Sequence, residues 1–282
     1  MPVPSDAVGQ QTIPISHTVD ARWLMSYAAG LGEHDAAYLD TTLPEGIAAH
    51  PLFPVCVEWP TVLALQAIES IAAAVTPEET RRGIHATHDC VLERPIVPGD
   101  VLTTVATVIG VERRRPGAFL TMDMISTDTS GAVVCRTRQG SLYLATDVSG
   151  PDRPAPAEEP LPPIEGDPVA TVEVAVDVGA AHVYTECARI WNPIHTDLAV
   201  ALAADLPGLI LHGTATLAHG VSAAVRHLGG GDPRSITCIR GRFGAMVPMP
   251  SALTVRLYGN GRFEVCTPDG ATAIRDGHVQ VG

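Results

Sequence analysis

A proline-rich, acidic segment divides this chain of 282 residues into two halves that share one order of elements. Residues 148–168 read VSGPDRPAPAEEPLPPIEGDP, a composition that stays extended and solvated. In each half, apolar helical stretches come before most of the strand-like sequence. The sequence therefore predicts an internal duplication of about 130 residues. We expect a first domain at 1–147, a linker at 148–168 and a second domain at 169–282.

The expected elements follow from apolar periodicity and from turn residues. In the first half we predict helices at 19–32, capped by Asp20, and at 61–75, followed by strands at 85–92, 101–111, 119–127 and 132–145. In the second half we predict a strand at 169–178, helices reaching about His227, and strands at 235–244, 253–258, 262–267 and 272–281.

Local sequence supports the duplication. Residues 97–103 (VPGDVLT) parallel residues 247–254 (VPMPSALT) with an offset of one residue. Tyr27 parallels Tyr184, and the His50-Pro51 pair occupies the place of His212-Gly213. The chain is thus expected to be α+β, with a helix and an antiparallel meander in each copy.

Composition excludes several classes of function. The net charge is −13, which argues against a nucleic-acid groove and against binding to an anionic membrane. The N-terminus lacks the apolar core of a secretory signal, and no apolar run reaches membrane-span length, so we expect a cytoplasmic protein. The six cysteines have no metal-ligand spacing and are expected to be reduced and mostly buried, although Cys187 lies near the candidate site.

The segment HATHD contains His85 and His88, which alternation in a strand would place on opposite faces. We therefore predict no metal site there and none elsewhere. No motif for a nucleotide or another cofactor is present, so no cofactor is expected.

The residues from Tyr184 to Gly213 include the residue types that acid–base catalysis uses. Asn192-Pro193-Ile194-His195 is a compact turn that ends in an imidazole, and Thr196-Asp197 opens a helix. The apolar run 209–211 leads into His212-Gly213 and a second helix, so the Gly213 N–H is expected at a helix N-terminus that favours negative charge. A histidine and such an N–H suit acid–base chemistry on a carbonyl compound.

The full spacing resembles the signature of the MaoC-like hydratases, also called (R)-specific enoyl-CoA hydratases or hydratase 2. Asn192, Pro193, His195, Asp197, His212 and Gly213 match that pattern in order and spacing. The resemblance covers nearly the whole chain and implies a double hotdog, in which two curved antiparallel sheets each wrap a central helix. It also implies that the N-terminal copy binds the acyl chain without catalysing, and that the C-terminal copy carries the chemistry.

One position departs from the family. Its catalytic aspartate lies five residues before the histidine, where this chain has Ile190. An isoleucine cannot hold water, so either another carboxylate substitutes or the chemistry has changed or been lost. Glu186 and Asp197 are the candidate substitutes, and a carboxylate on the substrate is another option. In the structural alternative, Glu186 is a solvated helix residue and Asp197 is a helix cap.

Each remaining candidate has a functional and a structural interpretation. His195 is predicted to move the proton and Asn192 to orient water, whereas a backbone-bonded histidine and a turn residue are the alternatives. Gly213 is predicted to hold the thioester oxygen, with Thr214, His212 and Tyr184 also binding substrate, although Gly213 can equally serve a tight helix entry and His212 a structural role. Arg189 is a further candidate for contact with substrate.

The sequence therefore predicts a hydratase or dehydratase that acts on enoyl or 3-hydroxyacyl thioesters of coenzyme A or an acyl carrier protein. A non-catalytic hotdog that binds acyl thioesters is the main alternative, because of Ile190. A hotdog thioesterase is a third hypothesis. Hotdog sheets often pair edge to edge, so a homodimer stays open.

Overall fold

The computed structural model describes residues 2–76 and 83–282, and these form two compact units that do not follow chain order. The first unit comprises Met1–His17, Val57–Cys90 and Val101–Pro160. The second comprises Thr18–Cys56, Val91–Asp100 and Leu161–Gly282. Both contain helices and antiparallel strands, which confirms the predicted α+β class. The boundaries at 147 and 169 stay a prediction.

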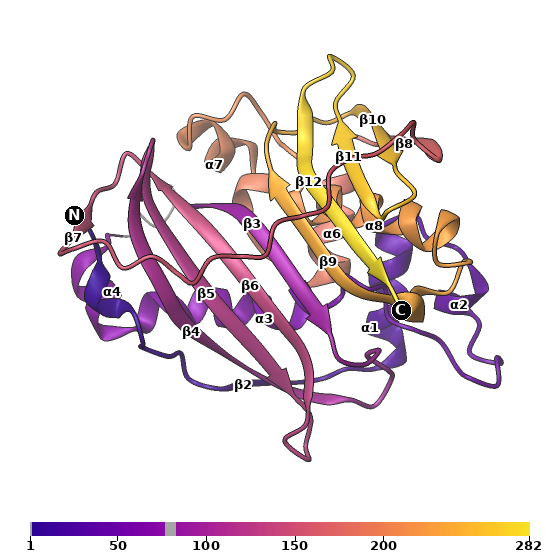
Figure 1. The fold of residues 1–282 in the computed structure, drawn as a ribbon, viewed down its shortest axis with the longest axis horizontal. Helices are drawn as coiled ribbons and strands as arrows, with labels where there is room; N and C mark the ends of the chain where they lie inside the picture. The colour runs from indigo at the N-terminus through magenta and orange to yellow at the C-terminus, as the bar shows by residue number, and fades with distance from the viewer. Residues whose placement is uncertain (1, 77–82) are drawn as a thin grey trace. The chain divides into compact units, whose positions relative to one another are not determined.

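The first unit is built on an antiparallel sheet in which neighbouring strands run in the order β2-β4-β5-β6-β3 (Figure 1). Its strands are β2 (Ile15–Thr18), β3 (Gly83–Leu92), β4 (Val101–Arg114), β5 (Gly117–Thr127) and β6 (Val133–Leu144). A short parallel pair joins β1 (Val3–Pro4) to β7 (Val148–Ser149), and η1 (Ser5–Ala7) follows β1. The four strands predicted between residues 85 and 145 are thereby confirmed, each within three residues at either end.

Helical segments pack their apolar side chains on the sheet of the first unit. They are α3 (Pro54–Ala64), η2 (Leu65–Ala67) and α4 (Glu69–Ala74), and α3 begins before the boundary of the unit. The prediction of one helix over 61–75 was wrong: the helix begins at Pro54, since proline suits a first helical turn. It is then interrupted at Ile68, which is extended and buries its side chain in the apolar core.

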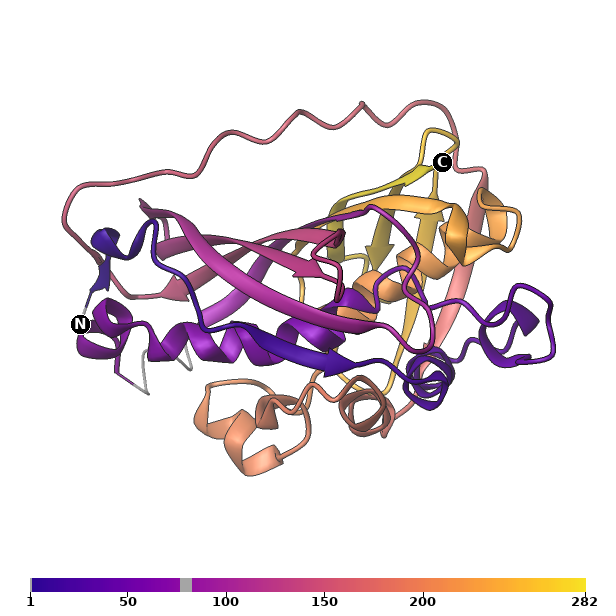
Figure 2. The same cartoon turned by 90° about the horizontal axis from the view of Figure 1, so that it is seen from below.

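The second unit has its own antiparallel strands, in the order β9-β12-β11-β10-β8. They are β8 (Ala170–Val176), β9 (Ile236–Phe243), β10 (Ser251–Leu257), β11 (Arg262–Cys266) and β12 (Thr272–Val281), as predicted. The helix α8 (Gly213–His227) packs against these strands, as Figure 2 shows. The packing is close at Gly220, where an added Cβ would lie 2.2 Å from the Phe263 ring.

Shorter helices complete the second unit. They are α1 (Ala21–Gly30), α2 (Ala36–Leu39), α6 (Ala180–Ala188), η3 (Pro193–His195), α7 (Leu198–Ala203) and η4 (Pro233–Ser235). The predicted cap is confirmed, because Asp20 accepts a hydrogen bond from the Trp23 N–H at 2.7 Å. Helices α1 and α6 approach closely at Gly30, where a Cβ would lie 2.8 Å from Cys187 Cβ.

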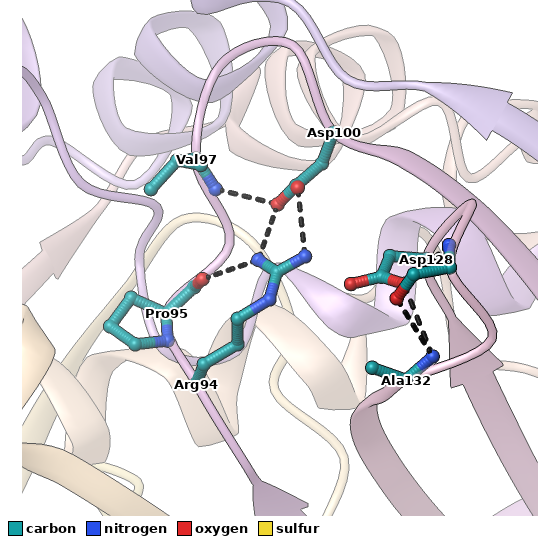
Figure 3. A network of polar contacts seen from close by, with 7 residues as sticks. Arg94, Pro95, Val97, Asp100, Asp128 and Ala132 are labelled. Carbon is teal, nitrogen blue, oxygen red and sulfur yellow. Dashed lines mark hydrogen bonds and ion pairs between the residues drawn. The ribbon is translucent and has the colours of Figure 1, made fainter.

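Polar side chains hold the turns that flank the strands (Figure 3). Before β4, Arg94 donates two hydrogen bonds to Asp100, at 2.8 and 2.9 Å, and the Val97 N–H donates to the same carboxylate at 3.0 Å. Gly99 has a φ of 96° there, which glycine adopts without strain. In the first unit, Asp128 accepts from the Ala132 N–H at 3.1 Å and closes the turn between β5 and β6.

Between Ser149 and Ala170 the chain forms no helix or strand, apart from one bridge between Val111 and Arg153. This agrees with the extended composition of that segment. In β3, by contrast, the expectation that His85 and His88 point to opposite faces was wrong: their ring centroids lie 5.4 Å apart. None of the helices in residues 2–76 and 83–282 has the length and apolarity that crossing a membrane requires.

Candidate functional site

The site begins where α6 ends. Helix α6 stops at Ala188 because Arg189 adopts the left-handed conformation, with φ 58°. The Arg189 guanidinium lies over the Trp23 ring, 4.0 Å from its centroid, and this contact offsets part of the conformational cost. The Ile190 N–H then donates to the Thr185 carbonyl at 3.1 Å, which turns the chain toward η3.

His195 is the last residue of η3, and its side chain is 9% exposed. Its Nδ1 lies 2.9 Å from the Ile210 carbonyl oxygen. Because a carbonyl only accepts, Nδ1 carries the proton and Nε2 carries the lone pair in the neutral ring. Burial lowers the pKa of His195, and the Ile210 carbonyl opposes this shift. The neutral ring therefore keeps its lone pair on Nε2, the nitrogen that can accept a proton.

A second imidazole lies against the first. The rings of His195 and His212 stack with centroids 3.8 Å apart and planes inclined by 26°. His212 Nε2 lies 3.2 Å from Thr185 Oγ1, which orients the ring. Burial and the neighbouring His195 hold the pKa of His212 well below its usual value, against the Ile190 carbonyl. Two stacked cations would repel each other, so the pair is best accommodated when both rings are neutral.

Gly213 begins α8, directly after His212 at the N-cap, as predicted. The first N–H groups of a helix have no partner within it, and the helix dipole favours a negative charge beside them. Gly213 and Thr214 are half-buried. Gly213 also permits close packing, since a Cβ there would lie 2.9 Å from the Phe243 ring. Both interpretations of this glycine therefore have a physical basis.

A chain of hydroxyl groups supports the start of α8. Tyr184 donates to Thr214 Oγ1 at 3.0 Å, and the Tyr27 hydroxyl lies 3.4 Å from that of Tyr184. Burial raises the pKa of both tyrosines, so they remain protonated donors. Sequence analysis predicted Tyr184 and Thr214 but not Tyr27 or Thr185. The parallel between Tyr27 and Tyr184 was the available signal for Tyr27; nothing in the sequence marked Thr185.

The other candidate residues lie at the edge of this arrangement. Asn192 is half-buried, and its carbonyl accepts from the His195 N–H at 3.2 Å. Asp197 caps α7, accepting from the Ala199 and Val200 N–H groups at 2.9 and 3.2 Å. Glu186 is exposed. These positions are those of a turn, a cap and a solvated helix residue, and they give neither carboxylate a contact with His195.

Cys187 and Ile190 have more definite surroundings. Burial and the neighbouring Glu186 raise the pKa of the Cys187 thiol, which works against a reactive thiolate. Ile190 is 5% exposed, so its apolar side chain fills a core position. Within residues 2–76 and 83–282, no three His, Cys, Asp or Glu side chains are grouped so that they could hold a metal ion. The residues brought together are thus two imidazoles, a helix start and hydroxyl groups.

Comparison with known proteins matches each half of the chain to a dehydratase-related region. Residues 161–276 match the family described as MaoC like domain, and residues 6–137 match the FAS1-like, dehydratase domain region. The chain is 23% identical over 278 residues to the enoyl-CoA hydratase ChsH3 of Mycobacterium tuberculosis, covering 93% of this chain and 91% of that protein.

Solved structures share the fold. The MaoC-like dehydratase of Phytophthora capsici superposes with a TM-score of 0.84 at 23% identity, over 99% of this chain and 97% of that one. A Mycobacterium tuberculosis protein described as a double hotdog fold gives a TM-score of 0.63 at 17% identity, over 97% and 96% of the two chains. The chain is therefore a double hotdog protein, as predicted. It contains a MaoC-like dehydratase domain in its second half and a FAS1-like dehydratase region in its first half.

Proposed function

We propose that this protein is an (R)-specific hydratase or dehydratase of enoyl and 3-hydroxyacyl thioesters, carried on coenzyme A or an acyl carrier protein in the cytoplasm. The observation that carries the proposal is the fixed tautomer of His195. Its Nδ1–H donates to the Ile210 carbonyl, so Nε2 is a neutral base. His212 stacks on the His195 ring and directly precedes Gly213, the first residue of α8.

In the hydration direction, His195 Nε2 takes a proton from water as the water oxygen bonds to the β-carbon of the enoyl thioester. The electrons of the double bond move toward the thioester oxygen, and the Gly213 N–H with the α8 dipole stabilises the enolate. The imidazolium then returns its proton to the α-carbon, giving the 3-hydroxyacyl thioester. One water enters and no other reactant is consumed. Asn192 orients the water, while Tyr184, Thr214 and His212 fix the helix start and bind substrate.

Ile190 separates this proposal from the two-residue chemistry that the family resemblance implies. With an apolar side chain at the position of the family aspartate, one imidazole has to both take and return the proton. We therefore expect slower turnover than a carboxylate–imidazole pair would give. The same observation favours a second candidate, a hotdog that binds acyl thioesters without turning them over.

Turnover distinguishes the two candidates. We expect trans-2-enoyl-CoA thioesters, from crotonyl-CoA to longer and branched chains, to lose their conjugated absorbance when mixed with the protein. His195→Gln should lower kcat/KM by about 10²–10⁴-fold, because it removes the base. His182→Gln is the matched control, since His182 is exposed and bonds the Thr196 carbonyl. Binding without loss of absorbance would support the non-catalytic candidate, and release of free thiol would point to a thioesterase.

A further inference from the structure

The inner face of the sheet in the first unit is mostly apolar along β4 and β5 and carries more polar side chains along β6 and β3. Strand alternation buries one set of side chains from each strand. Most buried residues of β4 and β5 belong to an apolar core, and the buried hydroxyl groups of Thr104 and Ser126 are bonded to each other. The buried residues of β6 and β3 include hydroxyl, amide and imidazole groups. The apolar set contains Ala106, Val108, Met122 and Met124, and the polar set contains Thr137, Gln139 and His88.

Contacts on the outer face fix the position of His88. A Cβ at Gly140 would lie 2.4 Å from Thr87 Oγ1, and Asp89 contributes to the raised pKa of Arg138. In an antiparallel pair, these two contacts place His88 opposite Gln139 on the inner face. His88 is then a diagonal neighbour of Thr137, with a separation of roughly 7–8 Å.

Helix α3 adds two polar side chains to the same place. Glu58 and Thr61 are three residues apart and so share one face of the helix. Glu58 accepts a hydrogen bond from Thr137 Oγ1 at 2.5 Å, which ties this helix face to β6. Glu58 is 2% exposed, Thr61 0% and His88 2%, so none of the three can be solvated from outside.

Several polar atoms of this cluster have no hydrogen-bond partner among residues 2–76 and 83–282. They are Glu58 Oε2, Thr61 Oγ1 and both ring nitrogens of His88. An unsatisfied buried polar atom destabilises a fold by about 1–3 kcal/mol, and native proteins contain few of them. Apolar side chains of the same size would serve the fold better. The cluster therefore has the arrangement of a binding site for a polar group.

Charge restricts the group that this cluster can bind. Burial raises the pKa of Glu58 to about 7, against the Thr137 hydrogen bond, and lowers the pKa of His88 to about 4. Both side chains are therefore neutral across mildly acidic pH. A neutral carboxyl, a neutral imidazole and a hydroxyl offer both donors and acceptors, which suits an uncharged group that also does both.

We propose that the first unit binds, between α3 and strands β6 and β3, an apolar ligand that carries a hydroxyl group. The hydroxyl lies among Glu58, Thr61 and His88, and the apolar body lies toward Met122 and Met124 on β5. This inference rests on the first unit alone and does not depend on the hydratase chemistry proposed for His195. The hydroxyl belongs either to a free lipid alcohol or to the far end of an acyl chain.

The first test compares two isomers, 1-decanol and 1-methoxynonane, which differ in having or lacking a hydroxyl donor. Binding to the full-length protein is measured by calorimetry and by the rise in Tm. We expect 1-decanol to bind roughly three- to tenfold more tightly, the effect of one or two added hydrogen bonds. Equal binding of the two isomers, or no binding of either, would overturn the proposal.

Substitutions then test which residues cause the preference for 1-decanol over 1-methoxynonane. Thr61→Val and His88→Leu should abolish it while raising the Tm of the ligand-free protein, because each removes an unsatisfied polar group. Thr104→Val is the matched control: its hydroxyl is buried in the same sheet but bonded to Ser126 Oγ at 2.7 Å, so this change should lower Tm and keep the preference. If Thr61→Val and His88→Leu lower Tm like the control, buried water satisfies the cluster and the proposal fails.

A second experiment identifies the source of the hydroxyl. Turnover of trans-2-dodecenoyl-CoA is compared with that of its 12-hydroxy form. A lower KM for the hydroxylated thioester, lost in Thr61→Val, would place the hydroxyl on the acyl chain; equal KM values with retained 1-decanol binding would assign it to a separate lipid. Retained 1-decanol binding with no turnover of either thioester would contradict the hydratase proposal but not this one.

Discussion

The imidazole of His195 has one nitrogen committed to the Ile210 carbonyl, so it can act on a ligand only through the other. The resemblance to the MaoC-like hydratases implies an aspartate as the second group on the water. Here Ile190 stands at that position, and the groups that shift the pKa of His195 are burial and a backbone carbonyl. At the scale of the residue, the open question is how much rate a carboxylate at position 190 would add.

Ile190→Asp tests this directly. We expect kcat for enoyl-CoA hydration to rise at least about tenfold, which corresponds to about 1.4 kcal/mol of transition-state stabilisation. The same change should lower the free energy of unfolding, because Ile190 is buried and a carboxylate there loses its hydration. Ile190→Asn controls for size and polarity without charge. A kcat that does not exceed that of Ile190→Asn would mean that position 190 no longer faces the water.

The pH dependence of hydration belongs to the same residue. Burial lowers the pKa of His195, so the neutral base persists below the ordinary value near 6.5. We expect kcat/KM to stay constant as the pH falls from 8 through about 6.5 and to decline only at lower pH. The stacked His212 titrates in contact with it, so the decline reports the pair. A decline centred above 6.5 would indicate a carboxylate partner that stabilises the protonated ring.

At the scale of the element, α8 holds the start of the site by packing closely on its sheet. In a helix interior, alanine is favoured over glycine by about 1 kcal/mol. At Gly220, however, a Cβ would lie 2.2 Å from the Phe263 ring, and overpacking of this kind costs about 1–3 kcal/mol. The packing cost exceeds the gain in helix propensity.

Gly220→Ala should therefore destabilise the protein, with a lower midpoint in urea unfolding. Gly208→Ala is the matched control, because Gly208 has a φ outside the left-handed region and nothing within 4 Å of its Cβ position. That change should alter the free energy of unfolding by less than about 0.5 kcal/mol. Stability equal to or above that of the wild type in Gly220→Ala would show that Phe263 can move aside without cost.

The elements that the sequence predicted best are those whose signals are local. Strand ends followed turn residues, and the caps Asp20 and Asp197 marked helix starts, because a cap acts within its own first turn. The break at Ile68 was missed, since it depends on where the core takes that side chain. The left-handed Arg189 was missed too, because its partner Trp23 lies far away in the chain.

In the candidate site, too, local features could be predicted from the sequence and tertiary contacts could not. Its residue types and order followed from spacing, so His195, His212 and Gly213 could be named in advance. The tautomer of His195 depends on the Ile210 carbonyl, and the stacking of His195 on His212 depends on how two turns meet. Such contacts are set by tertiary packing, which local periodicity does not encode.

At the scale of the whole molecule, the duplication has left two histidines in unlike states. The sequence parallel predicts that His50 corresponds to His212. Its Nδ1 accepts from the Leu52 N–H at 3.1 Å, and its Nε2 lies 3.1 Å from Ser222 Oγ. Both nitrogens are thus committed, and the ring is fully buried. The contacts of His50 are those of a histidine that supports the fold.

Buried histidines also set how the stability of the whole chain depends on pH. Burial lowers the pKa of His50 to about 3 and those of His88 and His219 to about 4. These rings are neutral when folded, but an unfolded chain protonates them near pH 6.5. Their contribution to stability is therefore complete above 6.5 and is lost as the pH falls toward 3–4. Glu58 has the opposite sign: its raised pKa, about 7, favours folding below pH 4.5 and less so as the pH rises through 7.

His50, His88 and His219, set against Glu58, leave the unfolded chain with about two more bound protons near pH 5.5. His85, His195, His212 and His278, whose pKa values burial also lowers, add to that number. Stability should therefore fall by at least about 3 kcal/mol per pH unit there. Urea unfolding at pH 7.5, 6.5 and 5.5 measures this slope. His88→Leu should reduce the slope by about one proton, or about 1.4 kcal/mol per pH unit, because leucine has no proton to gain on unfolding. His34→Gln, at an exposed position, should leave it unchanged. A slope that His88→Leu does not reduce would mean that His88 is solvated or paired in the folded protein, and the binding cluster inferred around Glu58 would lose one of its three members.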